Sequence, residues 1–298
     1  MNKIIQTLII FMVFAIGIVA CAPAATPIPS TATLQFTATD IPPTATQLPA
    51  VKIDPKNPLA VKFGQNPYSY STEVTNPGQA NQSVTVNFYL YLPETYGQDP
   101  KQKWPLLLSL HGSYQIGDNV TYLLQEGLAP ILVNKTDFPF IVVSPQLPRG
   151  LPAFESWTDI IDSLKLLLDQ VQSFYDVDPN RVSVTGFSMG GFGTWEFALR
   201  YPNYISAIAP IAGGYIYQSE EIPSTICALK DLPIWVFHGQ MDNVVDPKQA
   251  IELVDALKKC GGNPRFTLYP NSGHVGTWTK AYIDPELFTW LLAQSRPQ

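Results

Sequence analysis

The sequence predicts an α/β fold: a mostly parallel central sheet with helices on both faces and antiparallel strands on its N-terminal side. Short continuous apolar runs, typical of fully buried strands, recur after residue 100. Between them lie segments whose apolar residues repeat every three or four positions, which is the pattern of amphipathic helices. Residues 83–92 instead alternate apolar and polar side chains, as in an antiparallel strand with one solvated face. Buried strands that alternate with helices favour a parallel sheet covered on both faces.

The expected elements follow one another along the chain. Strands are expected at residues 83–92, 106–110, 140–144, 181–185, 205–211, 233–237 and 265–269. Helices are expected at residues 121–134, from 156 to 174, directly after 188, from 247 and from 285. Ser156, with Asp159 three positions later, forms a capping-box-like start for its helix. The last two helices each begin with Asp followed by Pro, a cap residue and the residue favoured at the first helical position.

The first 21 residues have the pattern of a secretory signal. Lys3 precedes an almost unbroken apolar run, Ile4–Ala20, which is shorter than the ~18–20 residues expected of a spanning helix. The run ends in IVAC at residues 18–21, which resembles the bacterial lipobox. We therefore expect a lipoprotein signal peptide at residues 1–20, a lipid on Cys21 and an exported chain anchored to the cell envelope. An uncleaved anchor and a plain secretory cleavage are the alternatives.

Residues 21–50 are expected to form a disordered linker. From Ala22 to Ala50 the sequence has six Pro, seven Thr and seven Ala, with one charge and no Gly. Such a stretch cannot bury enough apolar surface to offset the entropy lost on ordering. Residues 51–298 have the length of one α/β domain.

The composition excludes several classes of function. The chain has 298 residues, a formal charge of −6, 46% hydrophobic and 14% charged residues, which is typical of a globular protein. Lys and Arg do not cluster, so a nucleic-acid partner is not expected. The three His and three Cys are scattered, with no C-x-x-C or H-E-x-x-H, so neither a metal nor another cofactor is expected.

The most informative segment is VSVTGFSMGG at residues 182–191, where an apolar strand runs into G-x-S-x-G and a helical pattern follows. Glycine is expected at positions 186 and 190 for a steric reason. Where a strand turns abruptly into a helix, side chains two positions either side of Ser188 would collide. Ser188 would then be exposed at the sheet edge and at a helix N-terminus. A glycine-rich connection with an incidental serine is the alternative.

This segment resembles the nucleophile elbow of the α/β-hydrolase fold, in which a triad runs Ser, acid, His along the chain. His274 follows Ser188 in that order, whereas His238 precedes the plausible acids. The resemblance therefore implies Ser188 as nucleophile and His274 as base.

Two aspartates compete for the role of the acid, and both follow the strand expected at 233–237. Asp246 already has a structural role, because it caps the helix that begins at Pro247. Asp242 has no such role, and its segment reads H-G-x-x-D-x-V-V, as in many members of this fold. We therefore expect Asp242 to be the acid.

The resemblance also implies an oxyanion hole. The segment HGS, residues 111–113, lies where the strand expected at 106–110 ends. In this fold that loop supplies one backbone N–H of the oxyanion hole, and the residue after the nucleophile supplies the second. Position by position these are Ser113 and Met189. His111 is then a supporting residue rather than a second base.

The likeness reaches family level over about residues 83–295. SPQ at 144–146, the Trp157 helix, the elbow and SGH at 272–274 are similar to exported bacterial esterases of the feruloyl esterase, polyhydroxybutyrate depolymerase, phospholipase/carboxylesterase and prolyl-oligopeptidase-like groups. The resemblance implies serine-dependent cleavage of small-molecule or polysaccharide-linked carboxylic esters without a metal. Leu147 departs from the pattern, since family members often have Cys there.

Two other functions stay open. A small serine peptidase of prolyl-oligopeptidase type would use the same triad, although this chain has no room for the propeller domain of true members. A non-catalytic relative that holds glycan or polymer would have a damaged triad, whereas here Ser, Asp and His are all present in order. It would also favour an exposed aromatic row, which the sequence does not clearly show.

Cys227 and Cys260 are 33 positions apart and flank the segment that carries Asp242. In an exported domain they form either one disulfide, which would brace the acid loop, or two small buried apolar side chains. The sequence alone does not choose between the two.

Overall fold

The apolar runs of the sequence form the strands of one mixed sheet. The structure, a computed structural model, describes residues 51–52, 61–74, 82–150, 156–215 and 221–297. The expected signal peptide, the linker and Cys21 lie outside these residues. The described strands form a nine-stranded sheet in the order β1-β2-β3-β5-β4-β6-β7-β8-β9. They are β1 (Val51–Lys52), β2 (Gly64–Val74), β3 (Gln82–Leu92), β4 (Trp104–Leu110), β5 (Ile141–Pro145), β6 (Val177–Phe187), β7 (Ala207–Ile211), β8 (Trp235–Gly239) and β9 (Arg265–Tyr269).

The pairing directions confirm the predicted fold class. The strands from β5 through β4 and β6 to β9 pair in parallel. On the N-terminal side, β3 pairs antiparallel with both β2 and β5. The carboxyl ends of the parallel strands therefore meet at one edge of the sheet, which is where open α/β sheets place their chemistry.

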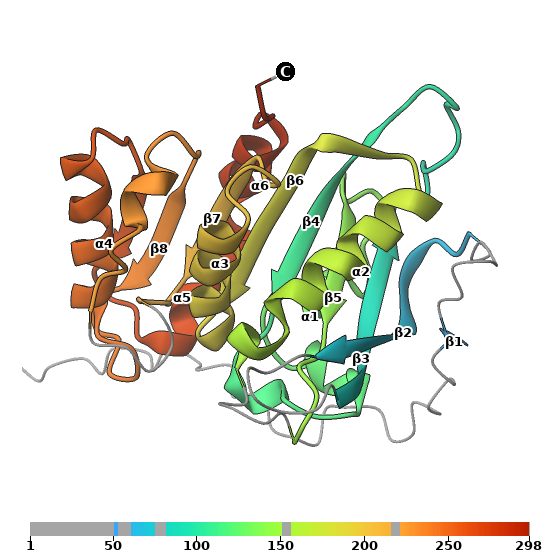
Figure 1. Cartoon of the computed structure of the whole chain (residues 1–298), viewed down its shortest axis with the longest axis horizontal. Coiled ribbons are helices and arrows are strands. Elements are labelled where there is room, and N and C mark those ends of the chain that lie inside the picture. The colour runs from blue at the N-terminus through green and yellow to red at the C-terminus, as the bar shows by residue number, and fades with distance from the viewer. Residues whose placement is uncertain (1–50, 53–60, 75–81, 151–155, 216–220, 298) are drawn as a thin grey trace, which may run out of the picture. The chain divides into compact units, whose positions relative to one another are not determined.

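Helices cover both faces of the sheet (Figure 1). Alternate side chains of a strand point to opposite faces, so Leu106 and Leu108 of β4 enter one core cluster and Leu107 enters another. Residues of α2, α3 and α4 pack in the first cluster, and residues of α1, α5 and α6 pack in the second. The helices are α1 (Ala129–Leu132), α2 (Ile161–Phe174), α3 (Met189–Arg200), α4 (Pro247–Lys259), α5 (His274–Ile283) and α6 (Pro285–Leu292), with 3-10 turns η1 (Ser113–Gln115), η2 (Val120–Leu124), η3 (Trp157–Ile160) and η4 (Ile226–Leu229).

The expected helix at residues 121–134 is wrong. The segment contains the short 3-10 turn η2 and the four-residue helix α1 instead. Between them Gly127 has a φ of 84°, a left-handed conformation that breaks a right-handed helix. The apolar spacing of this segment reflects packing of two separate turns rather than one continuous helix.

The predicted caps are confirmed. Ser156 and Asp159 form a reciprocal capping box, although the first turn that they cap is 3-10 rather than α-helical. The side chain of Asp246 accepts a hydrogen bond from the N–H of Lys248, and that of Asp284 accepts one from the N–H of Glu286. Each cap residue satisfies an N–H that the first helical turn leaves without a partner.

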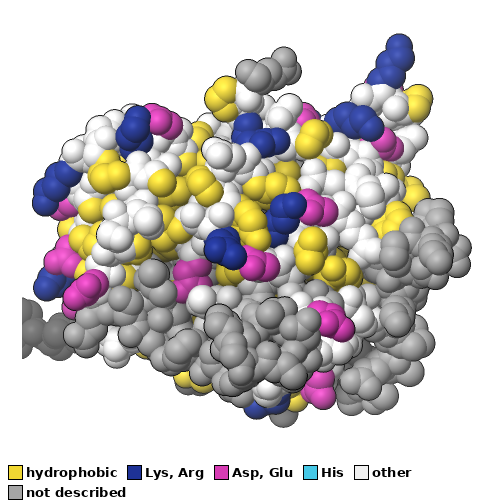
Figure 2. Space-filling model, in the orientation of Figure 1, with side chains coloured by type: hydrophobic (Ala, Val, Ile, Leu, Met, Phe, Trp, Pro, Cys, Tyr) yellow, Lys and Arg dark blue, Asp and Glu magenta, His cyan; other side chains and the backbone are white. Residues whose placement is uncertain are grey.

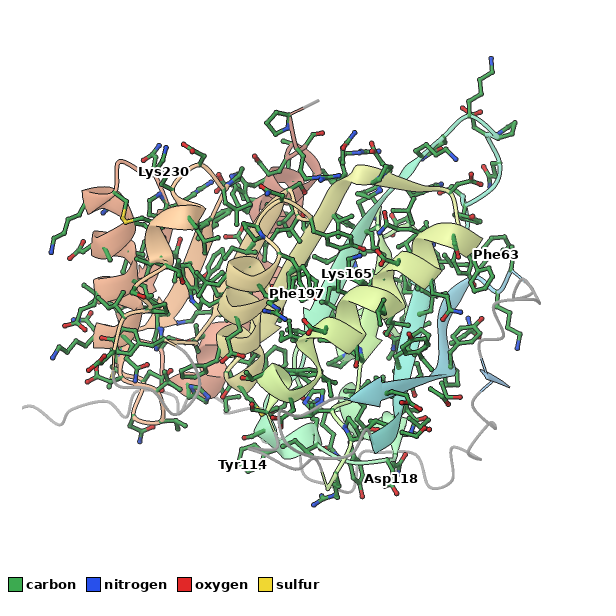
Figure 3. The ribbon with its side chains drawn as sticks, in the orientation of Figure 1. Phe63, Tyr114, Asp118, Lys165, Phe197 and Lys230 are labelled. Atoms are coloured by element: carbon green, nitrogen blue, oxygen red, sulfur yellow. A yellow bond between two sulfur atoms is a disulfide. The ribbon has the colours of Figure 1, made fainter. Side chains whose placement is uncertain are left out.

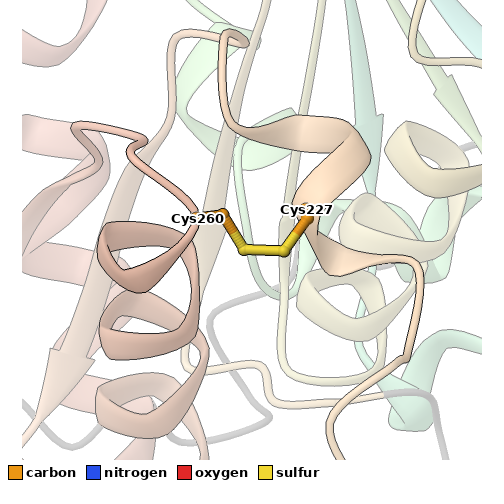
Figure 4. Close-up of a disulfide and its surroundings, with 2 residues drawn as sticks. All are labelled: Cys227 and Cys260. Atoms are coloured by element: carbon orange, nitrogen blue, oxygen red, sulfur yellow. A yellow bond between two sulfur atoms is a disulfide. The ribbon is translucent and has the colours of Figure 1, made fainter.

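A disulfide joins Cys227 of η4 to Cys260 at the C-terminal end of α4 (Figure 4). The bond connects the segment before β8 to the helix after it. The two cysteines are 33 positions apart, and a loop of this length corresponds to about 3–4 kcal/mol of stabilisation in the chain-entropy model. The loop that carries Asp242 lies within this closed ring.

Charges of both signs are interspersed on the face drawn in Figure 2. Described pairs include Lys165 with Asp169 on α2, and Arg200 with Asp162 between α3 and α2. Exposed pairs of this kind contribute at most about 1 kcal/mol each to stability. None of the helices within the described ranges has the length and apolar character needed to cross a membrane.

Candidate active site

Ser188 lies on a strained turn between β6 and α3. It has a φ of 57° and a ψ of −119°, a backbone conformation that residues other than glycine rarely adopt. Holding a residue in such a conformation costs on the order of 1–3 kcal/mol, which the surrounding structure must offset. The turn places the hydroxyl at the carboxyl end of β6 and at the N-terminus of α3.

The glycines two positions either side of Ser188 permit this turn. A Cβ atom on Gly186 would lie 2.2 Å from the carbonyl oxygen of Gly190, and one on Gly190 would lie 2.1 Å from that of Leu110. Both distances are far below van der Waals contact. The first is the collision that the sequence pattern predicts, whereas the second shows how closely α3 approaches the end of β4.

Three predicted residues come together at the carboxyl edge of the sheet. His274 Nε2 lies 2.8 Å from Ser188 Oγ, and His274 Nδ1 lies 2.7 Å from Asp242 Oδ2. Asp242 follows β8, whereas His274 is the first residue of α5. From the sequence no helix is expected at residues 274–283, where the segment is short and has no cap signal.

Asp242 is held in its ionised form. Burial raises the pKa of Asp242, but hydrogen bonds from His238, His274 and the N–H groups of Val245 and Val244 outweigh burial and hold the pKa well below its usual range. Oδ1 accepts the two backbone N–H groups at 3.0 Å each, which leaves Oδ2 for the imidazole of His274. The carboxylate therefore has a fixed orientation and a full set of donors.

His238 is a neighbour of the acid that sequence reasoning left unassigned. It is fully buried at the end of β8, and its Nε2 lies 3.3 Å from Asp242 Oδ2 and 3.1 Å from the carbonyl oxygen of Val245. Both of those atoms are acceptors, so Nε2 carries the proton. The spacing H-x-x-x-D was the available signal, since a tight turn after a strand brings these two positions together.

The two predicted oxyanion residues lie beside Ser188. Met189 is the first residue of α3, where the N–H has no acceptor within the helix. Ser113 begins η1, directly after Gly112, and a Cβ atom on Gly112 would lie 3.6 Å from Ser188 Cβ. Gly112 and Met189 therefore both border Ser188.

His111 sets the orientation of the peptide group between Gly112 and Ser113. The N–H of Leu147 donates to His111 Nε2 at 2.9 Å, so Nδ1 carries the proton and donates to the carbonyl oxygen of Gly112 at 2.6 Å. A trans peptide directs its C=O and N–H to opposite sides. Because His111 holds the Gly112 carbonyl, the N–H of Ser113 in the same peptide group points away from His111. Trp157 Nε1 adds a hydrogen bond to the carbonyl oxygen of His111.

The free energy of unfolding should depend on pH through His111. Burial lowers the pKa of His111 to about 4, partly opposed by its hydrogen bond to Gly112, whereas an unfolded histidine titrates near 6.5. Between those values the unfolded chain binds one more proton. We expect His111 to reduce stability by about 1.4 kcal/mol per pH unit as pH falls from 6.5 to 4.

Urea unfolding at pH 4.5, 5.5 and 6.5 measures this effect against His111→Gln, which does not titrate. The difference between the two unfolding free energies should change across the series, because other titrating groups contribute to both proteins alike. Parallel pH profiles for the two proteins would contradict the assignment.

Comparisons with known proteins identify the architecture. The family model described as Phospholipase/Carboxylesterase matches residues 153–280. The crystal structure of a thermostable esterase aligns over 76% of this chain and 63% of its own, with a TM-score of 0.58 and 27% identity. A ferulic acid esterase from Anaeromyces mucronatus aligns over 77% of this chain and 91% of its own, with a TM-score of 0.59 and 17% identity. The chain has the α/β-hydrolase fold.

Relatives of this α/β-hydrolase chain include esterases and a peptidase. A bifunctional acetylxylan esterase/xylanase of Neocallimastix patriciarum is 27% identical over 58% of this chain and 24% of its own length. A poly(3-hydroxyalkanoate) depolymerase of Paucimonas lemoignei is 28% identical over 53% of this chain and 45% of its own. An uncharacterized peptidase of Bacillus subtilis is 24% identical over 64% and 34%. The chain spans less than half the length of these relatives. Esterases thus occur both among these relatives and in the description of the family model.

Proposed function

We propose that this chain is an exported serine hydrolase that cleaves carboxylic esters through an acyl-enzyme. The observation that supports the proposal most is the unbroken hydrogen-bonded series from Ser188 through His274 to Asp242, with distances of 2.8 and 2.7 Å. The series starts on a strained turn at a helix N-terminus, which is the placement of an activated serine. Within the described residues no group of His, Cys, Asp and Glu has the arrangement of a metal site.

The three side chains have distinct roles in the proposed reaction. Asp242 accepts a hydrogen bond from the Nδ1–H of His274, so the imidazole presents an unprotonated Nε2 to Ser188. His274 takes the serine proton as Oγ attacks the acyl carbon, and Asp242 stabilises the imidazolium that forms. The imidazolium then gives its proton to the alcohol oxygen as the C–O bond breaks. Water repeats the sequence on the acyl-enzyme and releases the acid.

The backbone N–H groups of Ser113 and Met189 would hold the tetrahedral oxyanion. In comparable sites each such donor contributes about 3–4 kcal/mol to transition-state stabilisation. The neutral imidazole of His111 supports the Ser113 donor through the Gly112 carbonyl. A donor that is oriented before the substrate arrives needs no reorganisation during the reaction.

Export and lipid anchoring are the expected setting of this activity. Residues 1–20 and the lipobox-like end at Cys21 support them on the sequence alone. The disulfide between Cys227 and Cys260 fits an oxidising compartment, since cytosolic thiols are kept reduced. Residues 21–50 would then hold the catalytic domain, residues 51–298, at a distance from the membrane.

Exposed apolar side chains next to the proposed catalytic residues favour a substrate with an apolar part. Tyr114 follows Ser113 and is 84% exposed, Met241 precedes Asp242, and Val275 follows His274. Figure 3 shows Tyr114 at the end of the molecule where the parallel strands terminate. Small-molecule esters and esters linked to a polysaccharide or polyester both fit, in keeping with the substrates named for the two esterase relatives.

A panel of esters tests the proposal. Aryl esters from acetyl to octanoyl and a hydroxycinnamoyl ester should be hydrolysed by the purified full chain. A fluorophosphonate, which labels activated serines, should modify Ser188 once and abolish the activity, as peptide mass mapping would show. Hydrolysis of no ester, or a label on another residue with activity retained, would overturn the proposal.

A serine peptidase is the second candidate, because one relative is a peptidase that matches 64% of this chain. The same side chains would cleave an amide instead of an ester. Short chromogenic peptides with proline or other residues before the cleaved bond separate the two functions. A larger kcat/KM for a peptide than for every ester of the panel would favour the peptidase.

A further inference from the structure

Glu126 carries a buried carboxyl oxygen that the proposed triad does not use. Its Oε2 is shielded from solvent and has no hydrogen-bond partner among the described residues. A buried polar atom without a partner costs free energy, and a bound water or ligand can supply the missing hydrogen bond. Such an atom marks a place where a bound molecule can complete the hydrogen bonding.

The carboxyl group lies beside the proposed nucleophile. A Cβ atom built on Gly112 would lie 3.7 Å from Glu126 Oε2 and 3.6 Å from Ser188 Cβ, so both atoms border the same point. Gly112 has no side chain to occupy that point. The charge of His274 also lowers the pKa of Glu126, in part against burial.

Hydrogen bonds from buried glutamine side chains hold the backbone around Glu126 in place. The buried side chain of Gln115 donates from Nε2 to the carbonyl oxygens of Tyr122 at 3.0 Å and Glu126 at 3.1 Å. Gln146 in turn donates from Nε2 to the carbonyl oxygen of Gln115 at 2.9 Å. Glu126 is therefore held in place before a substrate arrives, as a specificity group should be.

We propose that Glu126 selects esters whose alcohol part carries a free hydroxyl group on the carbon next to the ester-bearing carbon. The inference rests on the proposed ester hydrolysis. Glu126 would bind this hydroxyl through Oε2, which otherwise stays unpaired. An alkyl alcohol offers no such bond and leaves the buried oxygen unsatisfied in the complex, which is an effective means of discrimination.

The alcohol part is the portion of the substrate nearest to both groups. The leaving oxygen receives its proton from His274 Nε2, so it must lie within hydrogen-bond distance of that atom. Glu126 borders Ser188 and interacts with His274. A hydroxyl close to the leaving oxygen therefore comes near Oε2, whereas a hydroxyl at the far end of a long acyl chain does not.

The contact does not depend on one protonation state of the carboxyl group. Burial raises the pKa of Glu126, and the interaction with His274 lowers it in part. A carboxylate accepts a hydrogen bond from the substrate hydroxyl, and a carboxylic acid donates one to the hydroxyl oxygen. Recognition of a hydroxyl is thus compatible with either form.

The test compares 2-hydroxyethyl acetate with n-propyl acetate, two esters of similar size, using the full chain. The ratio of their kcat/KM values is the readout, and Glu126→Ala is expected to lower this ratio about tenfold, as loss of one hydrogen bond to a buried carboxyl group predicts. Glu126→Gln keeps a carbonyl oxygen and should lower the ratio about threefold. If thermal unfolding shows that the alanine variant does not fold, the glutamine variant replaces it in the test.

Glu286→Gln is the matched control. Glu286 is an exposed carboxylate of α6 that pairs with Arg265 of β9, and its loss should leave the ratio unchanged. A structural role of Glu126 would lower kcat/KM for both esters equally, and an unchanged ratio would overturn the inference. Equal activity of the parent chain and Glu126→Ala toward the hydroxylated ester would overturn it as well. If neither ester nor any aryl ester is hydrolysed, the proposed function itself fails and this inference fails with it.

Discussion

Replacing Ser188 with alanine is expected to lower kcat for ester hydrolysis by about 10⁵- to 10⁶-fold. The change removes the Oγ atom that forms the acyl-enzyme in the proposed mechanism, so what would remain is the stabilisation of water attack by the proposed oxyanion hole. The fold should persist, because alanine adds no atom to the turn and tolerates a φ of 57° no worse than serine does. Steady-state kinetics with the best aryl ester measure the loss, and thermal unfolding confirms that the variant is folded.

Ser173→Ala is the control for this experiment. Ser173 is exposed near the end of α2 and donates only to the carbonyl oxygen of Gln170. Its loss should leave kcat and KM unchanged. Residual activity of Ser188→Ala above about 1% of the parent value, after purification from a host without esterase background, would rule out Ser188 as nucleophile.

Replacing Asp242 with asparagine is expected to lower kcat by about 10⁴-fold while the fold is retained. The amide is the same size, and its oxygen can keep the bonds from the N–H groups of Val244 and Val245. Its NH₂ group then faces His274 Nδ1 and donates to it. The imidazole proton moves to Nε2, which can no longer take the proton of Ser188. The loss should appear in kcat more than in KM, because the acid does not touch the substrate.

Asp246→Asn separates the two acids that the sequence offers. Asp246 caps α4 through the N–H of Lys248, and asparagine is an equally good cap residue. We expect its activity within about twofold of the parent chain, since it is Asp242 and not Asp246 that hydrogen-bonds to His274 among the described residues. A 10⁴-fold loss on replacing Asp246, with Asp242→Asn fully active, would reverse the assignment. Both variants differ from the parent by the same chemical change, so the comparison is matched.

Most of the sheet could be predicted because the information is local. An apolar run such as residues 106–110 specifies a buried strand by itself, and the alternation at 83–92 specifies a strand of a different kind. The cap residues Asp246 and Asp284 mark helix starts for the same reason. The prediction failed at 121–134, where Gly127 has a positive φ, and at α5, where the sequence has no cap signal.

Local sequence is enough to predict the class of the sheet and the turn at Ser188, because strand periodicity and the close approach of Gly186 to Gly190 involve residues that are near one another in the chain. The close approach of Gly190 to Leu110 is instead a tertiary contact. The tertiary structure alone decided which groups meet. Ser188, Asp242 and His274 come from three different connections, and only the parallel packing of β6, β7, β8 and β9 brings their ends to one edge. The tertiary structure also decides the position of the unpaired oxygen of Glu126. No local pattern encodes it, because its neighbours are far away along the chain and close only in the folded molecule.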